Sequence, residues 1–320
     1  MYDHIVIGAG PAGLSCAIEA GKKGLRALII DKGSVVNSIQ HFQRDMFFFS
    51  TPELLEIGDI PFVVPTVRPT SLDCVNYYRN VADHYKLDCR FYENITAVDK
   101  MDGSFALKSA SGSEFRSKGV VVATGYYDTP TPLGVPGEDL PHVSHYYRDP
   151  IPYYRRNVVI VGGKNSAVEA ALDLWRHGAN VTVVHRGEDM NPSVKYWIMP
   201  DFRNRVMDGS IKVYLSSVVK EIRQDEVTIQ SAVSGERALA ADALFILIGY
   251  LPDTRFLKSL GIAVDTETLA PVHNSESMET NIPGLYVAGG LVGGKFNNKV
   301  FIETGREHGK IIVAAYLRKA

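Results

Sequence analysis

Two segments of the sequence have the same order of elements, and this repeat constrains the fold more than any other feature. They are residues 4–31, HIVIGAGPAGLSCAIEAGKKGLRALIID, and residues 157–186, NVVIVGGKNSAVEAALDLWRHGANVTVVHR. Each contains an apolar strand, a glycine-rich turn, a helix rich in alanine and leucine, and a second apolar strand. Each segment therefore predicts a βαβ unit, and together they predict two dinucleotide-binding folds.

A proline-rich stretch at residues 126–141, YYDTPTPLGVPGEDLP, separates the two halves. Its proline density excludes a regular helix or a central strand. We expect helices that begin near Ser71 and cover residues 196–207. After Gly249 come the segment IPGLYVAGG and a long final helical pattern over residues 298–320.

This layout predicts an α/β fold of two Rossmann-like, three-layer ββα domains, with the second domain inserted into the first. The first domain is predicted to comprise residues 1–126 and 248–320. The inserted domain is predicted to comprise residues 127–247.

The overall composition excludes several classes of partner. A net charge of −2 without long like-charge runs gives no reason to expect nucleic acid or an anionic membrane. The longest apolar runs fall far short of the ~20 residues that span a bilayer, and the N-terminus has no signal-peptide pattern. We therefore expect a cytoplasmic protein with a small partner. The cysteines, Cys16, Cys74 and Cys89, are too few and too scattered for a disulfide framework or a metal site.

The first glycine motif comprises Gly8, Gly10 and Gly13. The first glycine allows a tight turn, the second lets the backbone approach a pyrophosphate, and the third lets the helix pack on the strand. The phosphates would lie at the helix N-terminus, where unpaired amides favour anions. Asp31 ends the second strand and is placed to accept hydrogen bonds from ribose hydroxyls. This combination predicts a nucleotide site.

The second motif departs from this pattern. Gly162 stands at its first position, Lys164 at its second and Ala167 at its third. A lysine conflicts with close phosphate approach unless its side chain turns away or contacts the phosphate. The following strand ends in His185 and Arg186 instead of an acid, and a guanidinium suits a 2′-phosphate. This favours NADPH over NADH; the alternative is that Arg186 is an ordinary surface residue.

The order GAGPAG, VVVATG, VVIVGG, ILIGYLPDT and IPGLYVAGG resembles the low-molecular-weight thioredoxin reductases over essentially the whole chain. The resemblance implies a homodimer with FAD on the first and last segments and NADPH on the insert. Those reductases carry a C-x-x-C pair just before the second glycine motif, and here that stretch has no cysteine. The dithiol relay of that family is therefore excluded.

Within this superfamily, the sequence most resembles the bacillithiol disulfide reductase group. The similar stretches include FFFSTPELLEIGDIPF, HYYRDPIPYYRRNVVIVGGKNSA, VTVVHRG, PSVKYWIMPDF and FIETGREHG. Lys164 and Gly290 are regular features of that group. One departure is Ala12, which occupies the position of the group's proposed redox cysteine.

The resemblance implies two sets of cofactor-binding residues and no metal site. Those for FAD are Gly8, Gly10, Pro11, Ala12, Gly13, Asp31, Lys32, Gln40, Ala123, Thr124, Gly125, Gly289, Gly290, Phe301 and Ile302. Those for NADPH are Gly162, Gly163, Lys164, Asn165, Ser166, His185, Arg186 and Gly249. The family architecture also implies that the final helix, beginning near Phe301 and Ile302, directs its dipole at the flavin.

Cys16 is the nearest cysteine to Ala12, but it lies one helical turn further on, along the packing face. Buried thiols on apolar helix faces are usually inert, so we interpret Cys16 as a packing residue rather than a redox group. The same reasoning makes Cys74 and Cys89 packing residues. The sequence therefore predicts no catalytic residue.

Two further groups have open interpretations. The aromatic residues of segments 46–50 and 145–154 would line a flavin and substrate cleft or pack in the core. Lys295, Lys299 and Arg306 would attract carboxylates of a thiol such as bacillithiol, or form a solvated helix face.

These observations predict an NADPH-dependent FAD oxidoreductase that reduces a low-molecular-weight disulfide without a protein dithiol. One alternative is a ferredoxin or flavodoxin reductase that passes electrons to a small carrier protein. Another is a flavin-binding sensor without turnover. A flavin monooxygenase is disfavoured because its F-x-G-x-x-x-H fingerprint is absent from the sequence.

Overall fold

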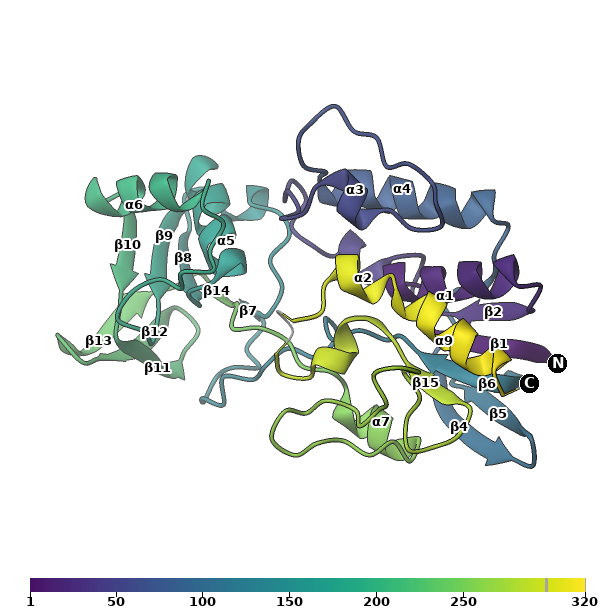
Figure 1. Cartoon of the computed structure of the whole chain (residues 1–320). Coiled ribbons are helices and arrows are strands. Elements are labelled where there is room, and N and C mark those ends of the chain that lie inside the picture. The colour runs from purple at the N-terminus through teal and green to yellow at the C-terminus, as the bar shows by residue number, and fades with distance from the viewer. Residues whose placement is uncertain (297–298, 320) are drawn as a thin grey trace. The chain divides into compact units, whose positions relative to one another are not determined.

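The computed structural model describes residues 1–296 and 299–319, which divide into two compact units (Figure 1). Unit 1 comprises Met1–Gln40, Phe47–Thr129 and Tyr250–Ala320, and unit 2 comprises His41–Met46 and Pro130–Gly249. Both units have the predicted Rossmann-like α/β fold. The sequence did not indicate that His41–Met46 would pack with unit 2.

Unit 1 is built on a seven-stranded sheet in the order β3-β2-β1-β6-β5-β4, with β15 also paired to β6. Its strands are β1 (Tyr2–Ile7), β2 (Ala27–Ile30), β3 (Asp88–Arg90), β4 (Ile95–Met101), β5 (Ser104–Ser109), β6 (Glu114–Val122) and β15 (Leu285–Val287). The first half of β6 pairs antiparallel with β5, and its second half lies parallel between β1 and β15. The carboxyl ends of β1, β6 and β15 therefore meet at one edge of the sheet.

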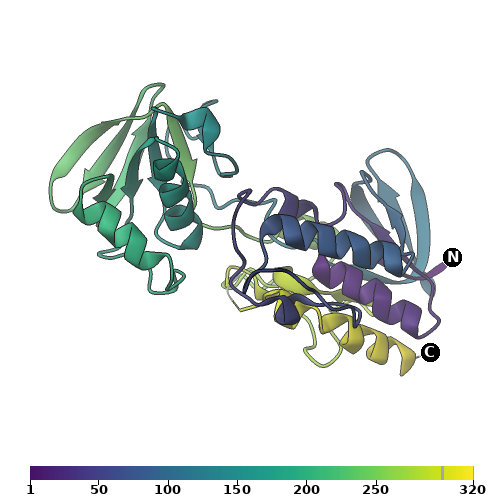
Figure 2. The same ribbon diagram turned by 90° about the horizontal axis from the view of Figure 1, so that it is seen from above.

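Helices cover one face of this sheet, and α1 packs along α9 in both views (Figures 1 and 2). The helices of unit 1 are α1 (Pro11–Lys22), α2 (Asn37–Gln40), α3 (Pro52–Leu55), α4 (Ser71–His84), α7 (Thr254–Ser259), α8 (Ile302–Gly305) and α9 (His308–Leu317), with a 3₁₀ turn at Gly289–Gly293. Helix α4 begins at the predicted Ser71, because Thr70 and Asp73 form a reciprocal capping box. Apolar side chains on the other sheet face pack with β4, β5 and α7.

The prediction of one long final helix is wrong, because the segment is not a single helix. The pattern forms two helices, α8 and α9, with a turn at Arg306 and Glu307 between them. Gly305 weakens the helix at this point, and the Arg306 carbonyl accepts a hydrogen bond from the Ser15 hydroxyl at 2.5 Å. Asn298, where the predicted pattern begins, lies outside the described residues.

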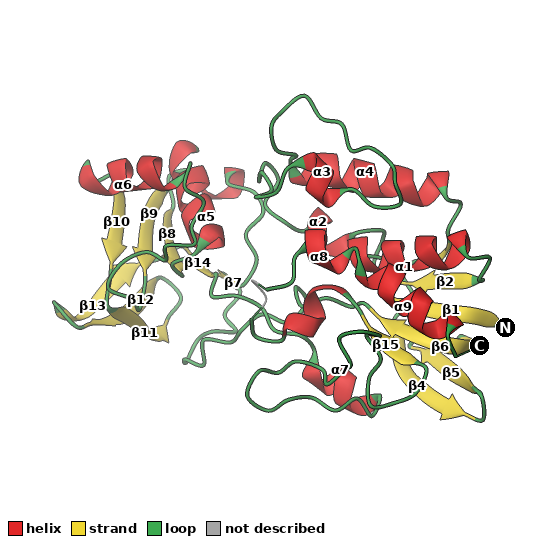
Figure 3. Ribbon diagram, viewed as in Figure 1, coloured by secondary structure: helices red, strands yellow, loops and turns green. Residues whose placement is uncertain are grey.

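Unit 2 contains a parallel sheet in the order β10-β9-β8-β14-β7 and a separate antiparallel sheet (Figure 3). The parallel strands are β7 (Val143–Ser144), β8 (Asn157–Val161), β9 (Asn180–Val184), β10 (Ile211–Tyr214) and β14 (Ala243–Ile246). The antiparallel strands are β11 (Ser217–Ile222), β12 (Glu226–Ser231) and β13 (Gly235–Ala240). The helices are α5 (Asn165–Arg176) and α6 (Met199–Met207), with a 3₁₀ turn at Ile151–Tyr153.

Alternate residues of β8 enter opposite cores, which gives unit 2 three layers. Val158 and Ile160 pack with α5 and α6, whereas Val159 and Val161 pack with β11 and β12. Helix α6 begins at Met199 rather than at Tyr196, and Pro200 lies in its first turn, where proline is well tolerated.

Residues 126–141 contain neither a helix nor a strand, as their prolines predicted. Within the described part of the chain, no helix is both long enough and apolar enough to cross a membrane.

Candidate dinucleotide-binding sites

The first glycine-rich turn connects β1 to α1, and its glycines face different surroundings. A Cβ on Gly8, whose φ is 113°, would lie 2.4 Å from the Ala123 carbonyl oxygen. A Cβ on Gly13 would lie 2.0 Å from the Gly8 carbonyl oxygen, whereas none of the described heavy atoms lies within 4 Å of one on Gly10. Gly8 and Gly13 therefore permit close backbone packing, and Gly10 leaves open space at the helix N-terminus.

Asp31 holds this turn in place. Its Oδ2 accepts a hydrogen bond from the Ala9 amide at 2.6 Å, and its Oδ1 accepts one from the Gly33 amide at 2.7 Å. Burial raises the pKa of Asp31, and these two backbone hydrogen bonds partly offset that effect. A carboxylate has about four acceptor sites, so Asp31 retains capacity for ribose hydroxyls.

Lys32 and Gln40, both predicted from the resemblance, have protein partners near this turn. Lys32 Nζ lies 3.1 Å from Asp128 Oδ2. Gln40 Nε2 donates to Ser34 Oγ at 2.7 Å and to the Val35 carbonyl at 2.8 Å. Lys32 therefore remains near the turn as a surface cation, and Gln40 stabilises the segment after β2.

The loops after β6 and β15 converge on the same sheet edge. Ala123, Thr124 and Gly125 follow β6, and Gly289 and Gly290 follow β15. A Cβ on Gly289 would lie 2.9 Å from the Ala12 Cβ, so the Ala12 side chain contacts this second loop. The predicted FAD residues of three separate chain segments are therefore brought together.

Two residues at this edge, Tyr126 and His308, were not predicted from the sequence. A Cβ on Gly290 would lie 2.5 Å from Tyr126 Cε1, so the tyrosine ring packs directly on that glycine. His308 Nδ1 accepts a hydrogen bond from the Gly289 amide at 3.1 Å. Burial lowers the pKa of His308 to about 4, which keeps its imidazole neutral and able to accept this bond.

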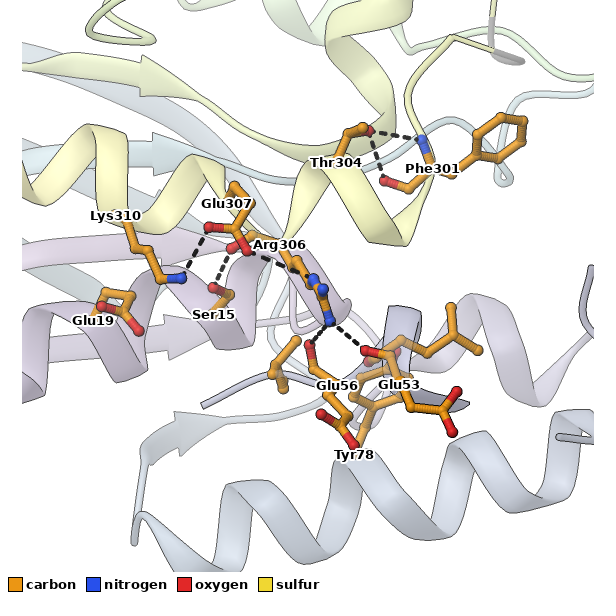
Figure 4. A network of polar contacts seen from close by, with 12 residues as sticks. Ser15, Glu19, Glu53, Glu56, Tyr78, Phe301, Thr304, Arg306, Glu307 and Lys310 are labelled. Atoms are coloured by element: carbon orange, nitrogen blue, oxygen red, sulfur yellow. Dashed lines mark hydrogen bonds and ion pairs between the residues drawn. The ribbon is translucent and has the colours of Figure 1, made fainter. Parts of the chain in front are cut away.

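Helix α8 is tied to the segment around α3 rather than presented as a cationic face (Figure 4). Arg306 Nη1 donates to the carbonyls of Glu53 and Glu56 at 3.0 and 2.7 Å. Ser50 Oγ also donates a hydrogen bond to Glu303. The alternative of a solvated residue is therefore wrong for Arg306, because its guanidinium is mostly buried and holds backbone carbonyls, whereas attraction of a carboxylate stays a prediction.

Phe301 precedes α8, and its amide donates to Thr304 Oγ1 at 3.3 Å. Because α8 has only four residues, few peptide dipoles add up at Phe301 and Ile302, and the dipole expected of a long helix is reduced. The Nζ atoms of Lys295 and Lys299 lie 5.3 and 4.8 Å from the centroid of the Phe296 ring.

The aromatic residues of segments 46–50 and 145–154 include both buried and exposed side chains. Tyr147 is buried and donates a hydrogen bond from its hydroxyl to Asp173 Oδ2 at 2.6 Å. Phe47, Phe49 and Tyr154 are exposed. Packing therefore accounts for Tyr147, and exposed aromatic surface remains in both segments.

The cysteines lie in environments that suppress thiolate formation. Cys16 is 3% exposed, where α1 approaches α9 so closely that a Cβ on Gly309 would lie 2.9 Å from the Cys16 Cα. Burial raises the pKa of Cys16 to about 12 and that of the half-buried Cys89 to about 11. Cys74 is fully buried, and burial raises its pKa as well. These environments support packing roles.

The second glycine-rich turn, between β8 and α5, packs against the His185 ring, which follows β9. A Cβ on Gly163 would lie 2.3 Å from the His185 ring, and one on Gly187 would lie 2.7 Å from it. A Cβ on Gly162 would lie 2.5 Å from the Leu247 carbonyl oxygen, so this glycine permits close backbone packing as well. Burial lowers the pKa of His185, so this ring forms a neutral wall rather than a cation.

Lys164 resolves the conflict noted in the sequence, because its exposed side chain extends from the start of α5 into a cleft. The next residue, Asn165, holds the facing loop: its Oδ1 accepts from the Lys195 amide at 2.7 Å, and its Nδ2 donates to the Ser193 carbonyl. Ser166 is exposed in the first turn of α5. Gly249 follows β14 and is not among the residues that line the cleft.

The cleft of unit 2 has a volume of about 1120 Å³. It is lined by Lys164, His185, Arg186, Gly187, Asp189, Met190, Asn191, Pro192, Val194, Tyr196, Met199, Pro200, Arg203, Asn204 and Met207. Lys164, His185 and Arg186 were predicted, whereas the contribution of α6 was not. Among the described lining residues, Lys164, Arg186 and Arg203 are basic and Asp189 is the one carboxylate, so the cleft fits a phosphorylated anion.

The family model for pyridine nucleotide-disulphide oxidoreductases matches residues 5–289 of the chain. The chain belongs to this family. Membership makes it an oxidoreductase that uses a flavin and a pyridine nucleotide. The order of its two glycine-rich turns agrees with that use.

Relatives within the family match along the full chain. Bacilliredoxin reductase Bdr of Bacillus subtilis (strain 168) is 40% identical over 315 residues, which cover 98% of this chain and 97% of the relative. The solved bacillithiol disulfide reductase Bdr (YpdA) of Staphylococcus aureus is 41% identical, with a TM-score of 0.95 and coverage of 99% and 98%. The corresponding structure from Bacillus cereus is 38% identical, with a TM-score of 0.96 and coverage of 100% and 99%.

Proposed function

We propose that this oxidoreductase uses NADPH and FAD to reduce a low-molecular-weight disulfide such as bacillithiol disulfide. The observation that carries the proposal is the full-length similarity to two solved bacillithiol disulfide reductases. We place FAD on unit 1 and NADPH on unit 2. We also infer a homodimer from the resemblance.

The open space at Gly10 and the remaining acceptor capacity of Asp31 fit a pyrophosphate and a ribose. The loops at Ala123–Gly125 and Gly289–Gly290 would complete the FAD site. Pro11, at the first position of α1, has a fixed φ that suits a helix start, and its missing N–H leaves no intrahelical hydrogen bond unmade. In unit 2, Lys164 and Arg186 would hold the NADPH phosphates, and His185 would form a wall.

The chemistry supplied by bound FAD and NADPH is the transfer of two electrons, which with two protons convert one disulfide into two thiols. The chain's own residues would bind and orient these groups. Because Cys16 and Cys74 are buried and have raised pKa values, we propose that no protein thiol takes part.

The proposal is tested by NADPH consumption of the FAD-loaded protein with a panel of acceptors. The panel contains bacillithiol disulfide, glutathione disulfide, oxidised thioredoxin, bacilliredoxin, ferredoxin and flavodoxin. We expect bacillithiol disulfide to give the highest kcat/KM, with two thiols formed per NADPH. Turnover with a carrier protein alone would overturn the choice of a small disulfide, and a ferredoxin or flavodoxin would then identify the electron-transferase alternative.

A further inference from the structure

Helix α6 presents one regular face to the cleft of unit 2. The residues of α6 that line the cleft are Met199, Pro200, Arg203, Asn204 and Met207. Their spacing of three and four positions puts them on one side of a helix. Residue Phe202, next to Arg203, is 1% exposed and packs into the core, so the helix is fixed with this face towards the cleft.

The other charged residues of α6 have short-range partners outside this face. Arg205 Nη1 lies 2.8 Å from Asp208, and its guanidinium carbon lies 4.8 Å from the centre of the Trp175 ring. Asp201 lies 2.6 Å from Arg176 of α5. These contacts hold α6 against α5, and they leave Arg203 as the cation that α6 contributes to the cleft.

Arg203 contacts its acidic neighbour only at long range. Its Nη2 lies 3.7 Å from Asp189 Oδ2, beyond hydrogen-bond distance, and both side chains are well exposed, at 63% and 70%. Such an exposed pair contributes little to stability, so Arg203 can exchange Asp189 for another anion at little cost. Asp189 is the only carboxylate among the lining residues in the described part of the chain.

The opposite wall of the cleft is more rigid. The His185 amide donates to the Tyr214 carbonyl at 2.9 Å, and the Gly187 carbonyl accepts from the Ser216 amide at 2.8 Å. Arg186 stands between these two anchored residues, and its side chain is exposed in the cleft. Arg186, whose chain neighbours are anchored by backbone hydrogen bonds, and Arg203 of α6 therefore line the same cleft.

We propose that Arg203 is a second ligand of the 2′-phosphate of NADPH, acting from α6 opposite Arg186, and that Asp189 competes with this phosphate for its guanidinium. This inference rests on the proposed use of NADPH by unit 2. Two guanidinium groups from separate elements can donate to different oxygens of one phosphate. NADH has no 2′-phosphate, so Arg203 contributes with Arg186 to the preference for NADPH.

The test is calorimetric titration of the FAD-loaded full chain with 2′,5′-ADP and, separately, with 5′-AMP. Arg203→Ala should weaken 2′,5′-ADP binding by roughly tenfold or more and leave 5′-AMP binding unchanged. Asp189→Asn, which removes the competing charge, should tighten 2′,5′-ADP binding. Lys220→Ala is the matched control, because it removes one exposed positive charge on β11, outside the cleft lining.

Arg203→Lys should recover only part of the affinity, because an ammonium group lacks the planar pair of donors. Equal binding of 2′,5′-ADP by Arg203→Ala and Lys220→Ala would overturn the role of Arg203 while leaving NADPH use intact. Equal loss of both nucleotides would also overturn it. If the unmodified protein bound 5′-AMP as tightly as 2′,5′-ADP, NADPH preference and this inference would both fail.

Discussion

At the scale of single residues, the three glycines of the first turn have separate physical roles. Gly13 lies against the Gly8 carbonyl, whereas Gly10 faces open space. The sequence motif predicts the close packing at Gly8 and Gly13, because it follows from local chain geometry, and the approach of a pyrophosphate at Gly10 stays a prediction. Tyr126 and His308 could not be predicted in the same way, since each reaches the site through a contact between distant chain segments.

Substitution by alanine should have different effects at Gly10 and at Gly13. Gly13→Ala places a Cβ 2.0 Å from a carbonyl oxygen, so it should lower the free energy of unfolding of the cofactor-free protein by about 1–3 kcal/mol. Gly10→Ala should leave the unfolding of that protein nearly unchanged and weaken FAD binding. Thermal unfolding and FAD titration measure the two effects. Wild-type FAD affinity in Gly10→Ala would contradict the placement of the pyrophosphate at Gly10.

At the scale of elements, the glycine-rich turns, the βαβ units and the start of α4 follow from periodicity and capping. The break between α8 and α9 does not, because it depends on Ser15 contacting the Arg306 carbonyl from a distant helix. The face of α6 was also missed, since the sequence alone does not place residues 199–207 beside the end of β9. Both misses come from tertiary contacts rather than local propensity.

A buried ion pair joins α5 to the loop that forms one wall of the unit 2 cleft. Lys195 Nζ lies 2.5 Å from Glu169 Oε1, and the two side chains are only 5% and 13% exposed. Burial raises the pKa of Glu169, and Lys195 opposes this effect. The pair therefore depends on both partners being present.

Lys195→Met should lower the free energy of unfolding by about 3 kcal/mol or more at neutral pH, because it leaves the Glu169 carboxylate buried without its cation. Adding Glu169→Gln should recover much of this loss, since the buried charge is then removed. Urea unfolding of the single and double variants measures both effects. Additive losses in the double variant would show that the pair does not act as a unit.

At the scale of the whole molecule, the order of motifs along the chain predicts the α/β fold and the family. The packing of His41–Met46 with unit 2 was not predicted, since it depends on contacts such as Gln43 Nε2 to Asp173 Oδ2 at 3.1 Å. The sequence also shows the cysteine content, but only the structure shows that Cys16 lies on α1 where this helix packs closely against α9.

The central claim is that disulfide reduction needs no thiol of the chain. It is tested most directly by the variant Cys16→Ser/Cys74→Ala/Cys89→Ser, with Cys16→Ser alone as a milder control. The measurement is anaerobic NADPH consumption by the FAD-loaded variants with bacillithiol disulfide. We predict a kcat/KM within about threefold of the unmodified protein for both variants. Loss of disulfide reduction, with FAD still bound and still reduced by NADPH, would contradict the claim.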